Sequence, residues 1–267
     1  MPANEEKKIR KSVSLNADSV VFDLEDAVPE SAKSEARTTL RSVINDLDWG
    51  HRELCIRVNK VGEDYSREDL GFAKGLSKIT AIMLPKIEHD PSAIAKETGK
   101  EINALVETAR GMTNLASIVS GKGITALSFG PQDFANSVGG SIEAYRMNNF
   151  VKTSIAVHAK AFGLDPIDGV YFELENLEGF KTEAFASKEL GFVGKQVVHP
   201  AQISVANEVF GVSPIEVSNA KKIVESYERA SREKLGAVRV DDKLVDAVHY
   251  RNAKAVLERA AIENGSQ

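Results

Sequence analysis

Short apolar runs rich in β-branched residues recur along the chain and alternate with segments of helical spacing. Most of these runs are continuous rather than interrupted by polar residues, which is the pattern of strands buried on both faces. Seven strands are predicted in this way, at 19–24, 54–58, 79–84, 102–107, 124–129, 168–172 and 196–199. Strands that alternate with helices form a parallel sheet with crossover helices, so the chain is predicted to be an α/β protein.

Two α/β architectures suit a chain of 267 residues, a TIM (β/α)8-type barrel and an open doubly wound sheet. The open sheet usually carries a glycine-rich nucleotide loop after its first strand, and no such loop is present here. We therefore expect the barrel. A barrel of this class has eight strands, so the first strand is expected to be missing and to be supplied by an upstream start or a neighbouring segment.

The strand rhythm stops after residue 212. Beyond it, the pattern predicts a long helix at 214–233, a small hairpin, and a terminal helix. We expect two domains, a (β/α) barrel catalytic domain at 1–212 and a C-terminal helical lid at 213–267.

Composition narrows the classes of protein to consider. The net charge of −5 leaves no basic footprint for nucleic acid or for an anionic membrane. The single cysteine, Cys55, stands in an apolar run and is predicted to be a small core residue, which excludes an internal disulfide framework. The N-terminus lacks the apolar core of a signal peptide, and no apolar run approaches the ~20 residues of a membrane span. A cytoplasmic location is expected.

Polar side chains follow nearly every predicted strand, where a barrel places its active site. They are Asp23, Glu25 and Asp26, then Arg57 and Asn59, Lys86 and Glu88, Glu107 and Arg110, Gln132 and Asp133, Glu173 and Glu175, and finally His199. Several carboxylates without cysteine and with few histidines favour a hard cation such as Mg²⁺. Glu107 and Asp133 follow adjacent strands and could share one ion, although solvated loop charges are the alternative because spacing alone does not select ligands.

The other candidates each have two interpretations. Arg57 is either a salt-bridged structural residue or a bidentate clamp for a substrate carboxylate. His199 is either a core histidine or a site residue, whereas His158 falls within a helical pattern and is expected to be structural. No nucleophile elbow or Walker loop is present.

Four motifs follow one another in a specific order. They are "DLEDAV" at 23–28, "LPKIE" at 84–88, "ETARG" at 107–111 and "GKQVVHPAQI" at 194–203. With the tail "LVDAVHYRNAKAVLERA", they resemble the citrate lyase β-subunit-like (CitE-like) proteins of the HpcH/HpaI aldolase/citrate lyase family, whose relatives include malyl-CoA and citramalyl-CoA lyases. The resemblance covers nearly the whole chain.

This resemblance implies a TIM barrel that acts with Mg²⁺ on an acyl-CoA thioester and a small oxoacid. It implies that Glu107 and Asp133 hold the metal, and that Glu25 and Asp26 support it through water as catalytic residues. It also implies that Asp246 is the acid/base and reaches a neighbouring subunit's site from the lid.

Substrate contacts follow from the same resemblance. Arg57 would orient the substrate, and Lys86, Pro2 and His199 would join it in substrate binding. The protein would be a homo-oligomer, a trimer or a hexamer, with no nucleic-acid or membrane partner.

The expected activity is therefore that of a Mg²⁺-dependent carbon–carbon lyase that cleaves or forms malyl-, citramalyl- or citryl-CoA. One alternative is a citrate lyase β-subunit that acts on an acyl-carrier-protein thioester within a complex. Another is an inactive barrel that serves as a binding or scaffold protein. The presence of Glu107, Asp133, Arg57 and Asp246 argues against an inactive protein.

Overall fold

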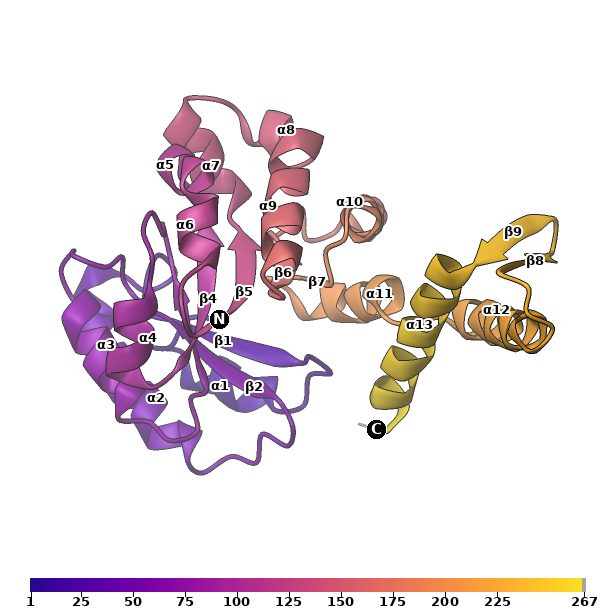
Figure 1. Ribbon diagram of the computed structural model, residues 1–267. Helices are drawn as coiled ribbons and strands as arrows, with labels where there is room; N and C mark the ends of the chain where they lie inside the picture. Colours follow the sequence, from indigo (N-terminus) through magenta and orange to yellow (C-terminus); the bar gives the residue numbers. More distant parts are fainter. Residues whose placement is uncertain (266–267) are drawn as a thin grey trace. The chain divides into compact units, whose positions relative to one another are not determined.

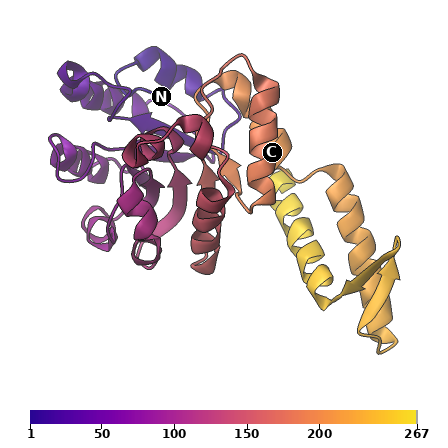
Figure 2. The ribbon, with the colours of Figure 1, turned by 90° about the horizontal axis from the view of Figure 1, so that it is seen from above.

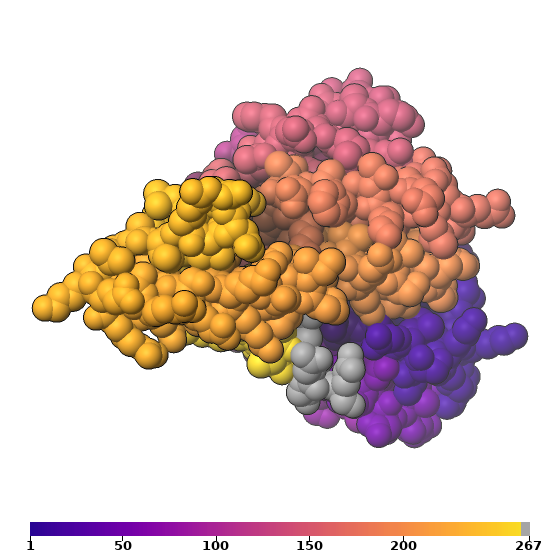
Figure 3. All heavy atoms as spheres, turned by 90° about the vertical axis from the view of Figure 1, so that its right-hand side faces the viewer, coloured from indigo at the N-terminus to yellow at the C-terminus, as the bar shows by residue number. Residues whose placement is uncertain are grey.

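The computed structural model describes residues 1–265 and divides into two compact units, Met1–Ala206 and a second unit that starts at Asn207. Figures 1 and 3 colour the first unit from indigo to orange and the second from orange to yellow. Among the described residues, no helix is both long and apolar enough to cross a bilayer.

The first unit is built on one parallel sheet whose strands follow chain order from β1 to β7. The strands are β1 (Ser19–Asp23), β2 (Glu53–Arg57), β3 (Ala81–Leu84), β4 (Glu101–Val106), β5 (Ile124–Phe129), β6 (Asp165–Asp168) and β7 (Gly194–Lys195). The sheet is curled into a half-barrel, with helices along its outer side (Figures 1 and 2). The α/β barrel-type fold predicted from the alternating pattern is confirmed.

The helices of this unit connect successive strands, except that the first helix precedes β1 and the last follows β7. They are α1 (Glu6–Ser12), the 3₁₀ turn η1 (Glu30–Ala32), α2 (Lys33–Ile44), α3 (Ser66–Lys74), α4 (Ser92–Thr98), α5 (Ala109–Thr113), α6 (Leu115–Val119), α7 (Pro131–Val138), α8 (Ile142–Tyr145), α9 (Asn149–Ala161), α10 (Leu177–Glu189) and α11 (Pro200–Phe210), which continues into the second unit. Helix α2 buries Ala36, Leu40 and Val43, the stripe that its spacing predicts.

Two strands lie upstream of their predicted positions. The sixth was predicted at 168–172, but β6 is Asp165–Asp168 and the apolar residues after it form a loop in which Tyr171 is buried. The seventh was predicted at 196–199, but β7 is only Gly194–Lys195. Both strands are short and polar, so the apolar residues next to them gave the stronger pattern.

The N-terminal residues pair with the exposed edge of β1. The Asp23 N–H donates to Met1 O at 2.8 Å, and the Ala3 N–H donates to Asp23 O at 2.9 Å, around a parallel bridge between Pro2 and Asp23. These residues therefore cover the carboxyl end of β1, at the position where the first barrel strand was expected.

The second unit contains α12 (Pro214–Arg232), the antiparallel pair β8 (Ala237–Val240) and β9 (Lys243–Asp246), and α13 (Ala247–Gly265). Ser213 and Glu216 form a capping box at the start of α12. Helices α12 and α13 pack together, and Tyr227 stacks on Tyr250 with ring centroids 4.9 Å apart. The predicted order of helix, hairpin and helix is found, while the role of this unit as a lid remains a prediction.

The strands of the first unit have one face toward the helices and one toward the concave side. Phe22 packs edge-on against Trp49, whose indole N–H donates to Ile44 O in α2, so Phe22 faces the helices. Val21 therefore faces the concave side, where it packs against the apolar cluster that includes Cys55 of β2 and Leu105 of β4. Cys55 is a buried core residue, as predicted.

Candidate active site

Three charged residues lie on the concave side of the sheet because side chains alternate along a strand. Side chains alternate between the two faces of a strand, so residues two positions apart share a face. Asp23, Arg57 and Glu107 each stand two positions beyond Val21, Cys55 and Leu105 respectively. The apolar inner surface therefore continues directly into charged groups at the carboxyl ends of β1, β2 and β4.

Asp23 holds Arg57 in a bidentate ion pair. Arg57 Nε donates to Asp23 Oδ1 at 2.8 Å and Nη2 donates to Oδ2 at 2.6 Å, because β1 and β2 align the two residues as direct neighbours. The same carboxylate accepts the Glu25 and Ala27 N–H groups at 2.9 and 3.1 Å. Burial raises the pKa of Asp23, but the Arg57 guanidinium outweighs it and holds that pKa below its usual value.

The role of Asp23 in holding Arg57 was not recognised in the sequence, although Asp23 had been noted among the strand-exit carboxylates. The sequence pattern could have predicted this pair, because Asp23 and Arg57 both end apolar strands that are neighbours in the predicted barrel. Arg57 is salt-bridged, as one of its two interpretations required, and this pairing also fixes its orientation in the site.

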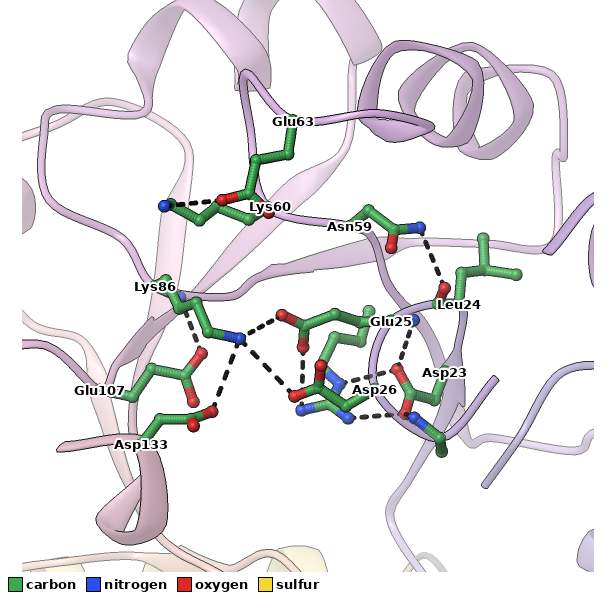
Figure 4. Close-up of polar contacts among 12 residues, drawn as sticks. Asp23, Leu24, Glu25, Asp26, Asn59, Lys60, Glu63, Lys86, Glu107 and Asp133 are labelled. Atoms are coloured by element: carbon green, nitrogen blue, oxygen red, sulfur yellow. Dashed lines mark hydrogen bonds and ion pairs between the residues drawn. The ribbon is translucent and has the colours of Figure 1, made fainter. Parts of the chain in front are cut away.

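The loop after β1 presents Glu25 to two cations. Glu25 Oε1 accepts from Lys86 Nζ at 2.6 Å, and Oε2 lies 3.2 Å from Arg57 Nη1 but has no hydrogen-bond partner. Burial raises the pKa of Glu25 despite both cations. Lys33 of α2 and Asn59 fix the loop by donating to Leu24 O at 2.9 and 3.0 Å, so Asn59 is a structural residue (Figure 4).

Glu107 is enclosed next to a glycine. Its Oε1 accepts the Lys86 N–H at 2.8 Å, and a Cβ on Gly130 would lie 2.4 Å from its Oε2. Only glycine therefore leaves room for this carboxylate at position 130. Burial and the nearby Glu25 charge raise the pKa of Glu107 to about 8, so its negative charge is poorly compensated by the protein.

Asp133 and Asp26 complete the carboxylate cluster, which we define as Asp23, Glu25, Asp26, Glu107 and Asp133. Asp133 lies in the first turn of α7, and its Oδ2 is 3.5 Å from Lys86 Nζ. Asp26 is largely exposed, with Oδ2 3.6 Å from the same nitrogen. Figure 4 shows Glu107 and Asp133 side by side, on the opposite side of Lys86 from Glu25.

Five carboxylates face two cations, Arg57 and Lys86, which leaves the site a formal charge of −3. Among the described residues, no group of three or more His, Cys, Asp or Glu side chains is arranged to hold a metal ion. The site instead offers Glu107 and Asp133, and further oxygen ligands would have to come from water or substrate. Glu25 Oε2, which has no hydrogen bond although it faces Arg57, the raised pKa of Glu107 and an all-oxygen donor set fit a hard divalent cation.

Two other predicted site residues of the first unit, Pro2 and His199, are not members of this cluster. Pro2 forms the bridge to Asp23 beside β1. His199 is exposed just before α11, and its Nδ1 accepts from the Ala201 N–H at 3.2 Å.

The remaining predicted residue, Asp246, belongs to the second unit. Its Oδ1 accepts the Val248 and His249 N–H groups at 2.9 and 3.2 Å, and it lies 2.7 Å from His249 Nδ1. The His249 hydrogen bond lowers the pKa of Asp246. The catalytic and binding roles of these residues remain predictions.

Known proteins are similar to this chain in sequence and in architecture. The chain is 34% identical over 265 residues to a (3S)-malyl-CoA thioesterase of Cereibacter sphaeroides, which covers 97% of this chain and 92% of the relative. It is 32% identical over 279 residues to the mitochondrial citramalyl-CoA lyase of Homo sapiens, covering 95% of this chain and 82% of the relative.

Among solved structures, the chain is similar to the protein CitE from Mycobacterium tuberculosis in complex with magnesium, acetoacetate and coenzyme A. The TM-score is 0.82 at 31% identity, and the match covers 98% of this chain and 96% of that one. The family model HpcH/HpaI aldolase/citrate lyase matches residues 1–200, which include the whole carboxylate cluster. The chain belongs to the HpcH/HpaI aldolase/citrate lyase family.

Proposed function

We propose that this protein is a Mg²⁺-dependent carbon–carbon lyase that cleaves or forms a 3-hydroxyacyl-CoA thioester such as malyl-, citramalyl- or citryl-CoA. The observation that carries the proposal is the carboxylate cluster, because its excess negative charge at the carboxyl ends of β1 and β4 suits a divalent cation. The similarity to a citramalyl-CoA lyase and to a CitE structure with magnesium and coenzyme A supports the choice of substrate and metal.

In this proposal Glu107 and Asp133 hold Mg²⁺. The bound ion would polarise the oxoacid carbonyl and hold its carboxylate. The raised pKa of Glu107 supports its role as a ligand, since a nearby cation stabilises the charged form that the protein alone disfavours. Gly130 leaves the space that the Glu107 side chain itself occupies.

Arg57 would orient the substrate. Asp23 occupies its Nε and one Nη2 hydrogen, and Glu25 faces its Nη1, so the second Nη2 hydrogen is available for a substrate carboxylate in a fixed direction. Glu25 and Asp26 would support the metal through water, while Lys86, Pro2 and His199 would contact the substrate. An orientation fixed before binding reduces the entropy that must be lost in the transition state.

Asp246 would act as the base that takes the proton of the substrate hydroxyl during cleavage. Its Oδ1 is occupied by two backbone N–H groups and by His249, which leaves Oδ2 for the substrate. We further propose that the chain assembles as a trimer or hexamer in the cytoplasm, and that Asp246 serves the site of a neighbouring subunit.

A second candidate function is hydrolysis of the same thioester, which the similarity to a (3S)-malyl-CoA thioesterase favours. The two reactions differ in the bond that breaks. A lyase releases an acyl-CoA and an oxoacid, whereas a thioesterase releases free coenzyme A and a hydroxy acid. A citrate lyase β-subunit or an inactive scaffold would do neither with a CoA thioester.

The test is to incubate the purified protein and Mg²⁺ with malyl-, citramalyl- and citryl-CoA, and to measure the oxoacid and the free thiol separately. The condensation of acetyl-CoA with glyoxylate runs in parallel. Oxoacid formation without free thiol supports the lyase, and free thiol supports the thioesterase. No product from any thioester would contradict both.

The site is tested by Glu107→Gln, which keeps the shape of the side chain and removes its charge. We expect kcat/KM to fall by about 10³-fold or more, because the ion loses a ligand and its Lewis-acid contribution. Glu101→Gln is the matched control, since Glu101 is exposed at the opposite end of β4. Equal activity of Glu107→Gln and the parent would refute the site.

A further inference from the structure

Lys86 has a backbone conformation that is unusual for its residue type. It lies just beyond β3 with φ at +49°, in the left-handed region that lysine rarely adopts. In this conformation its N–H donates to Glu107 Oε1 at 2.8 Å. Strained residues of this kind persist where the surroundings hold them and are common at functional sites. The contact with Glu107 comes from the backbone, so it does not depend on where the lysine side chain points.

The Lys86 ammonium lies among three carboxylates. Its Nζ is 2.6 Å from Glu25 Oε1, 3.5 Å from Asp133 Oδ2 and 3.6 Å from Asp26 Oδ2. Figure 4 shows the nitrogen at the centre of these contacts. The ammonium therefore partly neutralises Asp133, one of the two proposed metal ligands.

We propose that Lys86 is a built-in counter-ion of the carboxylate cluster, whose ammonium competes with the divalent cation for Asp133 and moves away from it when the ion binds. The inference rests on the metal site of the proposed function. An ammonium and a divalent ion near one carboxylate repel each other, so the lysine charge weakens metal binding. The ammonium can keep Glu25 while it releases Asp133, and the backbone N–H can keep Glu107 in place throughout.

This role differs from the substrate-binding role that the family resemblance implies for Lys86. A lysine that only binds the substrate would leave metal affinity unchanged when it is removed. A lysine that supports the metal ligands would make affinity weaker when it is removed. Only a competitor makes affinity stronger on its removal, so the sign of the change decides among the three.

The experiment measures Mg²⁺ affinity by calorimetry, without any thioester, for the parent, Lys86→Met and Lys60→Met. Lys86→Met removes the charge and keeps most of the length of the side chain. Lys60 is the matched control, because it lies on the loop after the neighbouring strand β2 and pairs with exposed Glu63 at 2.9 Å. We expect the Kd for Mg²⁺ to fall by about tenfold in Lys86→Met and to stay unchanged in Lys60→Met.

Thermal unfolding, with and without Mg²⁺, shows whether the variants fold. We expect the metal-free Lys86→Met variant to melt at a lower temperature than the parent, and Mg²⁺ to raise its Tm by more. If Lys86→Met does not fold, Lys86→Gln removes the charge and retains a hydrogen-bond donor. Lys86→Arg keeps the charge and should resemble the parent.

The outcomes separate this inference from the proposed function. An unchanged or higher Kd in the uncharged variant overturns the competition, even if the parent cleaves a thioester with Mg²⁺. A lower Kd supports it, even if the parent is inactive on every thioester. Absence of Mg²⁺ binding in the parent and in the uncharged variants contradicts both.

Discussion

The first unit holds two clusters of charged side chains that differ in charge balance and in enclosure. The carboxylate cluster has five acids and two cations at the ends of the first strands, and Asp26 and Asp133 are partly exposed. The second, which we call the buried ion cluster, consists of Lys152, Asp168, Glu183, Lys195 and the hydroxyl of Ser187. Its four charged side chains are at most 4% exposed.

The buried ion cluster is balanced, with two cations and two carboxylates. Lys195 Nζ lies 2.6 Å from Asp168 Oδ2 and 2.7 Å from Glu183 Oε1. Lys152 Nζ lies 2.9 Å from Asp168 Oδ1 and donates to Ser187 Oγ at 2.9 Å. These groups come from α9, β6, α10 and β7. The ion pairs therefore link helices α9 and α10 to strands β6 and β7.

The net charge of each cluster indicates whether it serves the fold or a ligand. In a balanced and enclosed cluster the charges compensate one another without a ligand, although loss of any member leaves an uncompensated buried charge. An unbalanced cluster needs a cation or a proton from outside. The carboxylate cluster is therefore expected to respond to pH and to Mg²⁺, and the buried ion cluster to respond only to mutation.

The largest expected effect is the pH dependence of the metal-free protein. The pKa of Glu107 is raised from 4.5 to about 8 in the folded chain, so folding favours its protonated form. Its contribution to the free energy of unfolding is complete below pH 4.5 and is lost as pH rises to about 8, by on the order of 5 kcal/mol. Urea unfolding in a chelator, followed by the fluorescence of Trp49, measures this loss in the first unit, since Trp49 is the sole tryptophan and is buried there.

Glu107→Gln is the control for this pH effect, because it cannot titrate. The difference in unfolding free energy between the parent and Glu107→Gln should change with pH in the metal-free state. Mg²⁺ should reduce the change in the parent, since the ion stabilises the ionised carboxylate. Parallel pH curves for the two proteins without metal would show that Glu107 titrates normally.

The next effect is the loss of stability in Lys152→Met. This substitution leaves Asp168 with one cation fewer in an enclosed site, and we expect it to cost about 3–5 kcal/mol. The matched control is Lys160→Met on the same helix, where the lysine is 48% exposed and lies 3.6 Å from Asp165. The control should cost at most about 1 kcal/mol. Similar urea midpoints for the two variants would show that enclosure does not set the energy of these pairs.

Asp23→Asn is expected to have a smaller effect on stability but a clear one on activity. It removes the charge that holds Arg57 and weakens two backbone hydrogen bonds, at a cost of about 1–3 kcal/mol. A loosely held Arg57 should raise KM for the substrate more than it lowers kcat. Steady-state kinetics tests this, and an unchanged KM would mean that Arg57 keeps its orientation without Asp23.

The sequence predicted the carboxylate cluster better than the buried ion cluster, for a physical reason. Asp23, Arg57 and Glu107 each follow a continuous apolar strand, so their positions and shared face can be inferred from the period of the strands. Lys152 and Glu183 lie on helices and meet only through packing between distant segments. One signal was present, since Lys152 falls on the buried stripe of α9 with Ile155 and Ala159.

The same reasoning explains the errors in the fold. Strands β1 to β5 are apolar and were found near their predicted positions. Strand β6 contains Pro166 between Asp165 and Asp168, and β7 has two residues, so neither forms an apolar run. The unusual φ of Lys86 had no sequence signal, because glycine is the residue that marks such a backbone.

The smallest expected effect lies at the rim of the buried ion cluster. Arg146 Nη1 lies 2.9 Å from both oxygens of Glu173, which is half exposed, and its Nε lies 3.5 Å from the buried Glu183 Oε2. Glu173→Gln should therefore change the unfolding free energy by about 0.2–1 kcal/mol, because water replaces the lost partner.

Arg146→Met is compared with Glu173→Gln, because it removes the other member of the same ion pair. Glu183 Oε2 has no hydrogen-bond partner, so Arg146 is the cation that faces it. The arginine variant should cost more than Glu173→Gln, although both break the same pair, and urea unfolding of the two variants measures the difference. Equal costs would mean that Arg146 contributes only through Glu173, and that the buried ion cluster ends at Glu183.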